Sequence, residues 1–223
     1  MAVVGVDGCR KGWIALRWSE SGSSLHWLAR LEELDQWADL EAVALDIPLG
    51  LSVTGERRCD QLARARLGRR ASTLFNAPPR ACLESGLDYP RANALSRSLS
   101  GRGLSRQSFA LVAKIREADD YWRRSRAPLF EAHPELGFAH LNAGVALASK
   151  KSWAGLMQRR ELLERAGLAL DDLGRDLRHA SADDVVDAAV CALVARRIRD
   201  HQAQALPDPP DYDETGRAMA IHY

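Results

Sequence analysis

The sequence predicts an α/β protein that contains a mixed β-sheet. Three apolar segments rich in strand-forming residues open the chain, at residues 2–7, 12–19 and 24–31. The connections between them are too short for a crossover, so these strands are expected to be antiparallel. Apolar residues then recur at helical spacing over 31–40 and lead into an apolar strand at 43–45. A strand that is reached through a helix lies parallel to its neighbour, which makes the sheet mixed.

The rest of the chain continues with helices and short strands. Helical periodicity predicts four further helices, at residues 56–68, 107–124, 152–166 and 182–199. A short strand is expected at 128–132, and residues 217–223 are a candidate for a last one. Two segments rich in turn-forming residues are expected to be loops, at residues 69–105 and 206–216.

The length and the charge distribution limit the organisation and the partners. A chain of 223 residues fits one domain over residues 1–223, with a basic insertion at about 69–128. The formal net charge of +1 indicates no partner by itself. Residues 57–126, however, contain 16 Lys or Arg against six Asp or Glu. That excess is typical of a surface that binds an anionic partner, and equally of a solvated helical face rich in Arg.

Cysteine usage and hydropathy indicate the compartment. The four cysteines show neither the close spacing of a metal knuckle nor that of a disulfide framework, which suits a reducing environment. The chain has no recognisable secretory leader and no apolar run long enough to span a membrane. We therefore expect a cytoplasmic protein that does not bind membranes. The oligomeric state stays open, with a homodimer as one option.

Carboxylates stand at the ends of several buried elements. Asp7 and Asp46 each follow an apolar strand, at the sheet edge where open α/β proteins bind ligands. Asp184 and Asp187 are three positions apart on the last long helix, so they share one face. Glu131 lies in another predicted strand, where an unpaired charge would be costly. We expect these acids to converge on one site.

Such a cluster repels itself unless a cation neutralises it, and carboxylate oxygens are typical ligands of Mg²⁺ or Mn²⁺. Two such ions can activate a water and stabilise the leaving oxygen in phosphodiester hydrolysis. Some of these acids could also have a purely structural role. Asp7 before Gly8 also suits a turn, and Asp183 and Asp184 also suit the first turn of a helix. His133 is a weaker candidate for a general base, because a His before Pro is more often structural.

Seven motifs occur between residue 2 and about residue 199: VVGVDGCRKGW, ALDIPLGL, RRCDQLARARLGRR, KIREADDYW, FEAHPELGF, ASKKSW and SADDVVDAAVCAL. In this order they resemble the DUF429 family of predicted ribonuclease H-like nucleases. The resemblance implies a ribonuclease H-like fold, with a mixed five-stranded sheet, three antiparallel opening strands and helices on both faces. The first strand and the last helix also resemble those of Holliday-junction resolvases of the RuvC type.

The resemblance also implies site residues. The catalytic carboxylates would be Asp7, Asp46, Glu131, Asp184 and Asp187. All of these except Glu131 would also hold the metal. Asp46 stands where the resolvases have a Glu, which shortens its reach by one methylene.

The expected function is that of a nuclease that hydrolyses phosphodiester bonds of nucleic acid with Mg²⁺ or Mn²⁺ as cofactor. The basic side chains expected to contact the nucleic acid are Arg69, Arg70, Lys114, Lys150 and Lys151. Two other functions compete with this one. One is a nucleotide- or phosphate-binding protein of the actin-kinase branch of the fold, with VDGCRKG as its phosphate loop, and the other is a catalytically inactive scaffold. The sequence does not specify DNA or RNA.

Overall fold

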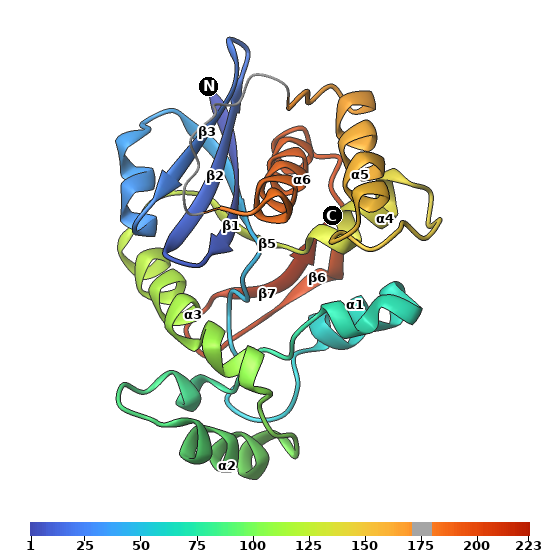
Figure 1. Cartoon of the computed structure of the whole chain (residues 1–223). Coiled ribbons are helices and arrows are strands. Elements are labelled where there is room, and N and C mark those ends of the chain that lie inside the picture. Colours follow the sequence, from blue (N-terminus) through green and yellow to red (C-terminus); the bar gives the residue numbers. More distant parts are fainter. Residues whose placement is uncertain (171–179) are drawn as a thin grey trace. The chain divides into compact units, whose positions relative to one another are not determined.

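The computed structural model describes residues 1–170 and 180–223 of the chain (Figure 1). It divides into two compact units. The first unit comprises Met1–Ile47, Arg124–Gln204 and His222–Tyr223, and the second comprises Pro48–Arg123 and Ala205–Ile221. The single domain with an insertion at about 69–128 stays a prediction.

Five strands form the sheet of the first unit, in the order β3-β2-β1-β4-β5 (Figure 1). Strands β1 (Ala2–Cys9), β2 (Gly12–Ser19) and β3 (Gly22–Leu28) are antiparallel, as predicted from their short connections. Strand β4 (Leu40–Leu45) lies parallel to β1, and β5 (Leu129–Ala132) lies parallel to β4. The α/β class and the mixed sheet are therefore confirmed.

Helix α6 (Ala182–Arg199) packs against β1, β2 and β4, and α4 (Pro134–Leu141) and α5 (Trp153–Arg165) pack against α6 (Figure 1). Ser181 caps α6, since its hydroxyl accepts a hydrogen bond from Asp184 N. The ten residues 186–195 of α6 are all buried, and four of them are alanines. Small side chains allow the helix to approach the sheet closely, which places its first turns above the ends of β1 and β4.

Gly5 marks the closest approach between β1 and α6. A Cβ atom at this position would lie 1.9 Å from Ala192 N and 2.1 Å from Ala188 O, closer than any real contact. Only glycine fits here, because the atoms that would be struck belong to the helix backbone. Gly5 and Asp7 are two positions apart on β1 and face the same side of the sheet. The glycine therefore fixes the helix over the side of the sheet from which Asp7 projects.

The second unit contains most of the remaining elements. Its helices are α1 (Arg58–Leu67), α2 (Tyr89–Ser100) and α3 (Arg106–Arg124), with short 3-10 helices η2 (Gly68–Thr73) and η3 (Arg80–Leu83). Its strands are β6 (Ala205–Tyr212) and β7 (Ala218–His222), whose last residue falls in the first unit. Within the described residues, no helix has both the length and the apolarity needed to cross a membrane.

The number of strands corrects the sequence prediction. Seven strands are present in the described residues, where five were expected. The segment 206–216 was predicted to be a loop because of its prolines, yet it contains most of β6. Proline removes a backbone donor, which a strand at the edge of a sheet tolerates, and β6 is the last strand in the sheet order.

Three helical predictions also need correction. The segment 69–105 was expected to be irregular, but it contains η2, η3 and the helix α2. Asp88 caps α2 by accepting a hydrogen bond from Arg91 N, and Gly101 ends the helix in the left-handed conformation. The segment 31–40 was expected to be a longer helix and forms only η1 (Leu31–Gln36). The helix α4 was not predicted; it begins at Pro134, a residue that suits the first helical turn.

Candidate functional site

Two carboxylates lie side by side at the carboxyl ends of β1 and β4. The pairing of Val6 with Leu45 aligns Asp7 with Asp46, and Asp46 N donates a hydrogen bond to Val6 O at 2.9 Å. Asp7 Oδ1 accepts a hydrogen bond from Gly8 N at 2.7 Å. This bond has the form of a local turn contact, the structural alternative for Asp7. It leaves Oδ2 for other contacts.

Asp187 reaches the same place from the second turn of α6. Its side chain is buried, only 2% exposed, on the helix face that covers β1. Its neighbour Ala188 lies directly above Gly5. The close helix approach that glycine permits thus carries Asp187 to the strand ends. Three acids from three separate elements, Asp7, Asp46 and Asp187, form what we call the acid cluster.

Electrostatics show that the members of the acid cluster are neighbours. Burial, and then the charges of Asp46, Asp187 and Asp184, hold the pKa of Asp7 well above its usual range. Burial and the charge of Asp187 raise the pKa of Asp46 to about 8. Burial also raises the pKa of Asp187 to about 6, although a neighbouring lysine opposes the shift. The cluster therefore lacks sufficient positive charge to ionise fully at neutral pH.

That lysine is Lys150, whose ammonium group forms an ion pair with Asp187 Oδ2. Burial lowers the pKa of Lys150, but the opposite charges of the acids outweigh it and hold the pKa well above its usual range. The other oxygen, Asp187 Oδ1, is buried and has no hydrogen-bond partner in the described part of the chain. A buried carboxylate oxygen without a partner is costly. The oxygen is thus available to a cation or a donor that enters the site.

The other two predicted acids are placed differently. Asp184 completes a capping box at the start of α6, where its Oδ2 accepts a hydrogen bond from Ser181 N at 2.8 Å. It still adds negative charge at Asp7. Glu131 lies in β5 between Phe130 and Ala132, which both pack on the α6 side of the sheet. Strand alternation therefore directs Glu131 to the opposite face, although its charge still raises the pKa of Asp46.

A comparison with protein families supports the resemblance seen in the sequence. Residues 5–212 match the model of a family described as a protein of unknown function, DUF429. The chain belongs to the DUF429 family. No curated protein and no solved structure matches it. The family assignment names no activity, so the function of this DUF429 protein has to be argued from its site.

The acid cluster of the DUF429 protein fits a hard divalent cation in its chemistry. Its donors are carboxylate oxygens, and one of them, Asp187 Oδ1, has no partner among the described residues. The positions of the side chains fit a metal ion less closely than their chemistry does. Within residues 1–170 and 180–223, no group of three or more His, Cys, Asp or Glu side chains is arranged so as to hold a metal ion. Lys150 lies where such an ion would neutralise Asp187.

Sequence reasoning missed the pair that supports Lys150. Glu135 of α4 and Arg159 of α5 are both buried and form an ion pair of 2.6 Å. Arg159 Nη1 also donates to Ala148 O at 2.9 Å and to Gly155 O at 3.0 Å. The bond to Ala148 O attaches the segment before α5, which carries Lys150, to the helix, whereas the bond to Gly155 O lies within α5. The motif FEAHPELGF contains Glu135, but no sequence signal links it to Arg159.

The residues predicted to contact nucleic acid fall in both units. Lys150 and Lys151 belong to the first unit, where Lys150 contacts the acid cluster and Lys151 is exposed. Arg69, Arg70 and Lys114 belong to the second unit, on η2 and α3. Their contact with nucleic acid stays a prediction.

Acids of the second unit neutralise part of the basic charge of residues 57–126. Arg80 forms ion pairs with Asp119 at 3.0 Å and with Asp213. Burial opposes the ionisation of Asp213, but hydrogen bonds from Thr215 and from the N–H groups of Leu51 and Arg217 lower its pKa to about 2. The net basic charge counted in the sequence thus overstates the charge that is free to attract an anion.

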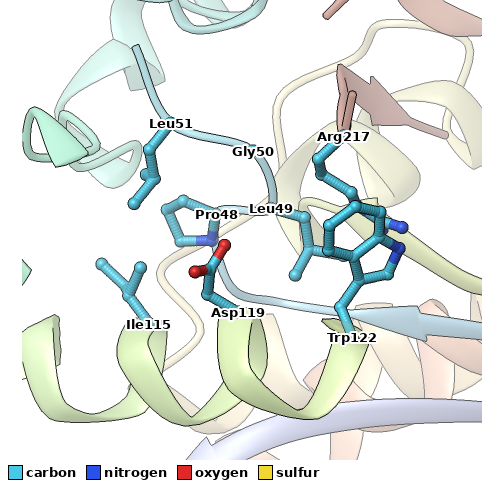
Figure 2. A pocket seen from close by; sticks show the side chains of 8 residues that line it. All are labelled: Pro48, Leu49, Gly50, Leu51, Ile115, Asp119, Trp122 and Arg217. Carbon is cyan, nitrogen blue, oxygen red and sulfur yellow. The ribbon is translucent and has the colours of Figure 1, made fainter. Parts of the chain in front are cut away.

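Figure 2 shows a small hollow in the second unit, whose lining residues are Pro48, Leu49, Gly50, Leu51, Ile115, Asp119, Trp122 and Arg217. The guanidinium of Arg217 lies over the ring of Trp122, 5.0 Å from its centroid. Asp119 accepts hydrogen bonds from Arg80 and Arg123. The two charged side chains that line this hollow, Asp119 and Arg217, thus both contact residues of the same unit.

Proposed function

We propose that this DUF429 protein is a divalent-metal-dependent nuclease that hydrolyses phosphodiester bonds of nucleic acid. The observation that carries the proposal is the acid cluster. Asp7, Asp46 and Asp187 come from three elements, and the charge of Asp187 raises the pKa values of both Asp7 and Asp46. A protein that needed only a stable fold would gain from separating these charges or replacing them with apolar groups. Their convergence supports the proposal that the site binds a cation.

The sheet of the first unit supports a ribonuclease H-like fold for the proposal. Its strand order is β3-β2-β1-β4-β5, with three antiparallel strands followed by two that run parallel to β1. This is the arrangement implied by the resemblance to ribonuclease H-like nucleases and to resolvases of the RuvC type. In it, Asp7 lies two residues before the end of the first strand, Asp46 follows the fourth, and Asp187 lies on the last helix.

Each acid and lysine of the site has its own role in the proposed reaction. Asp7, Asp46 and Asp187 would hold Mg²⁺ or Mn²⁺, which supplies activation of a water and stabilisation of the leaving oxygen when bound. Asp184 would keep the start of α6 in place through its capping box and add charge beside Asp7. Glu131 is the fifth candidate and acts through its charge on Asp46. Lys150 and Lys151 would contact substrate phosphates.

The test is cleavage by the purified full chain. Labelled duplex, RNA–DNA hybrid, single-stranded and junction substrates are incubated with Mg²⁺ or Mn²⁺ and with a chelator. We expect metal-dependent cleavage that Asp7→Asn abolishes and that Glu164→Gln, an exposed change on α5, leaves intact. Cleavage that survives Asp7→Asn, or that persists with the chelator, would contradict the proposal.

A further inference from the structure

Trp153 is the most exposed large apolar side chain of the described residues after Met1, with 75% of its surface in solvent. It is the first residue of α5 and follows Lys150, Lys151 and Ser152. Lys150 contacts Asp187 of the acid cluster. Three residues span at most about 11 Å of chain, so Trp153 lies close to the candidate site.

The backbone that carries Trp153 is held firmly. Ser152 N and Ser152 Oγ both donate to Ser149 O, at 2.9 and 2.7 Å, and Gly155 N donates to Ser152 Oγ at 3.1 Å. A Cβ at Gly155 would lie 2.0 Å from Ser149 O, so the loop and the helix are in direct backbone contact. The indole is thus presented to solvent by a fixed support, which lowers the entropy lost when it binds a ligand.

The size of the exposed surface argues for a small planar partner. A Trp side chain offers at most about 250 Å² of surface, whereas a stable protein interface takes about 800 Å² from each partner. The residues beside it, Lys151, Ser152 and Ala154, are exposed and are polar or small. An aromatic ring next to an exposed lysine provides the two contacts that a nucleotide needs, a stacking surface and a charge for its phosphate.

We propose that Trp153 stacks on an unpaired base of the nucleic acid, so that the substrate of the acid cluster is a strand with unpaired bases beside the phosphodiester bond that is cleaved. This inference rests on the proposed function and specifies its substrate class. A base within a continuous duplex has both faces covered by its neighbours and is not available to Trp153. Single strands, bulges and branch points expose such faces.

The test measures binding without cleavage. Fluorescence anisotropy of labelled oligothymidylate, oligouridylate and a blunt duplex is recorded with the full chain, in low salt and with a chelator. We expect Trp153→Ala to weaken binding of the single strands about 5- to 140-fold, which corresponds to the about 1–3 kcal/mol of one stacked base, and to leave duplex binding unchanged. Trp153→Phe keeps a ring and should retain part of the affinity.

Trp27→Ala is the matched control, because Trp27 is also exposed, at 38%, and lies on β3 of the same unit. It should bind single strands as the unchanged protein does. Thermal melts check that each variant is folded. Equal binding by the unchanged protein and Trp153→Ala would overturn the stacking proposal.

Other outcomes separate this inference from the proposed function. If Trp153→Ala binds normally and Asp7→Asn still abolishes cleavage, the stacking proposal fails and the nuclease proposal stands. If the unchanged protein binds none of the probes, both fail. Light scattering is run in parallel: a dimer that becomes a monomer in Trp153→Ala would show that the indole covers a second copy of the chain, which also overturns stacking.

Discussion

Lys150 and Asp187 form an ion pair at the acid cluster, in which the lysine supplies positive charge to a buried carboxylate. The lysine side chain is 38% exposed and comes from the segment before α5, whereas the aspartate is fixed in α6. The ammonium group can therefore move away from Asp187 by rotation of the lysine side chain alone. The backbone of the aspartate, in contrast, is fixed in α6.

This difference predicts that Lys150 and a metal ion compete for Asp187. Lys150→Met should strengthen Mn²⁺ binding about three- to tenfold, because a partly exposed ion pair of up to about 1 kcal/mol no longer has to break and a like charge is removed. The affinity is measured by isothermal titration calorimetry in the absence of substrate. Lys151→Met, an exposed change next to it, is the control and should leave the affinity nearly unchanged. Weaker binding by Lys150→Met would contradict competition.

The acid cluster predicts how stability depends on pH. The folded-state pKa values of Asp46, about 8, and Asp187, about 6, lie above the unfolded value of about 3.9. Between the two values the folded state binds more protons, so the free energy of unfolding falls as pH rises. Without metal, the protein should be more stable at pH 5 than at pH 8. Thermal melts across this range measure the change.

Two further measurements test whether the acid cluster causes this pH dependence of stability. Asp46→Asn removes the group with the pKa of about 8, so the loss of stability between pH 6 and pH 8 should become smaller. Added Mn²⁺ should have the same effect, since a bound cation keeps the carboxylates ionised. A melting temperature that stays constant from pH 5 to pH 8 without metal would contradict the raised pKa values of Asp46 and Asp187.

The elements that carry the acid cluster could be predicted from sequence patterns, but the contacts that surround the cluster could not. Strand β1, strand β4 and helix α6 show strong apolar patterns, so the positions of Asp7, Asp46 and Asp187 could be predicted to converge. The strand β6 was missed because its prolines are typical of loops, although an edge strand tolerates them. The helix α2 was missed because its composition is irregular, and its capping residue is not detected by apolar periodicity. The sequence predicts only that Lys150 contacts the phosphates of a nucleic acid. Its contact with Asp187 depends on packing between α5 and α6.

Gly5 predicts that the site depends on one close backbone contact. Gly5→Ala should lower the free energy of unfolding by about 3 kcal/mol or more, since its Cβ would overlap Ala192 N and Ala188 O. Urea denaturation measures the loss. Because backbone atoms are struck, Ala188→Gly or Ala192→Gly in the same chain should not restore stability. Restoration by either change would mean that side chains, not the backbone, set the distance between β1 and α6.

The buried pair of Glu135 and Arg159 predicts an asymmetric mutational response. Arg159→Met should cost about 3–5 kcal/mol, because it leaves the carboxylate of Glu135 buried without its partner and removes the bonds to Ala148 O and Gly155 O. Arg160→Met, in an exposed pair with Glu164, should cost less than about 1 kcal/mol. Urea denaturation measures both variants.

The double change Glu135→Leu with Arg159→Met separates charge from packing. It removes both charges and should recover much of the stability lost in Arg159→Met, since a buried ion pair is often no better than apolar groups of similar volume. It should not recover the hold on the Lys150 segment, because the hydrogen bonds to Ala148 O and Gly155 O are still missing. Faster amide hydrogen exchange in that segment of a stable double variant would therefore identify Arg159 as the residue that positions Lys150 at Asp187. Unchanged exchange would show that the backbone bonds around Ser152 suffice.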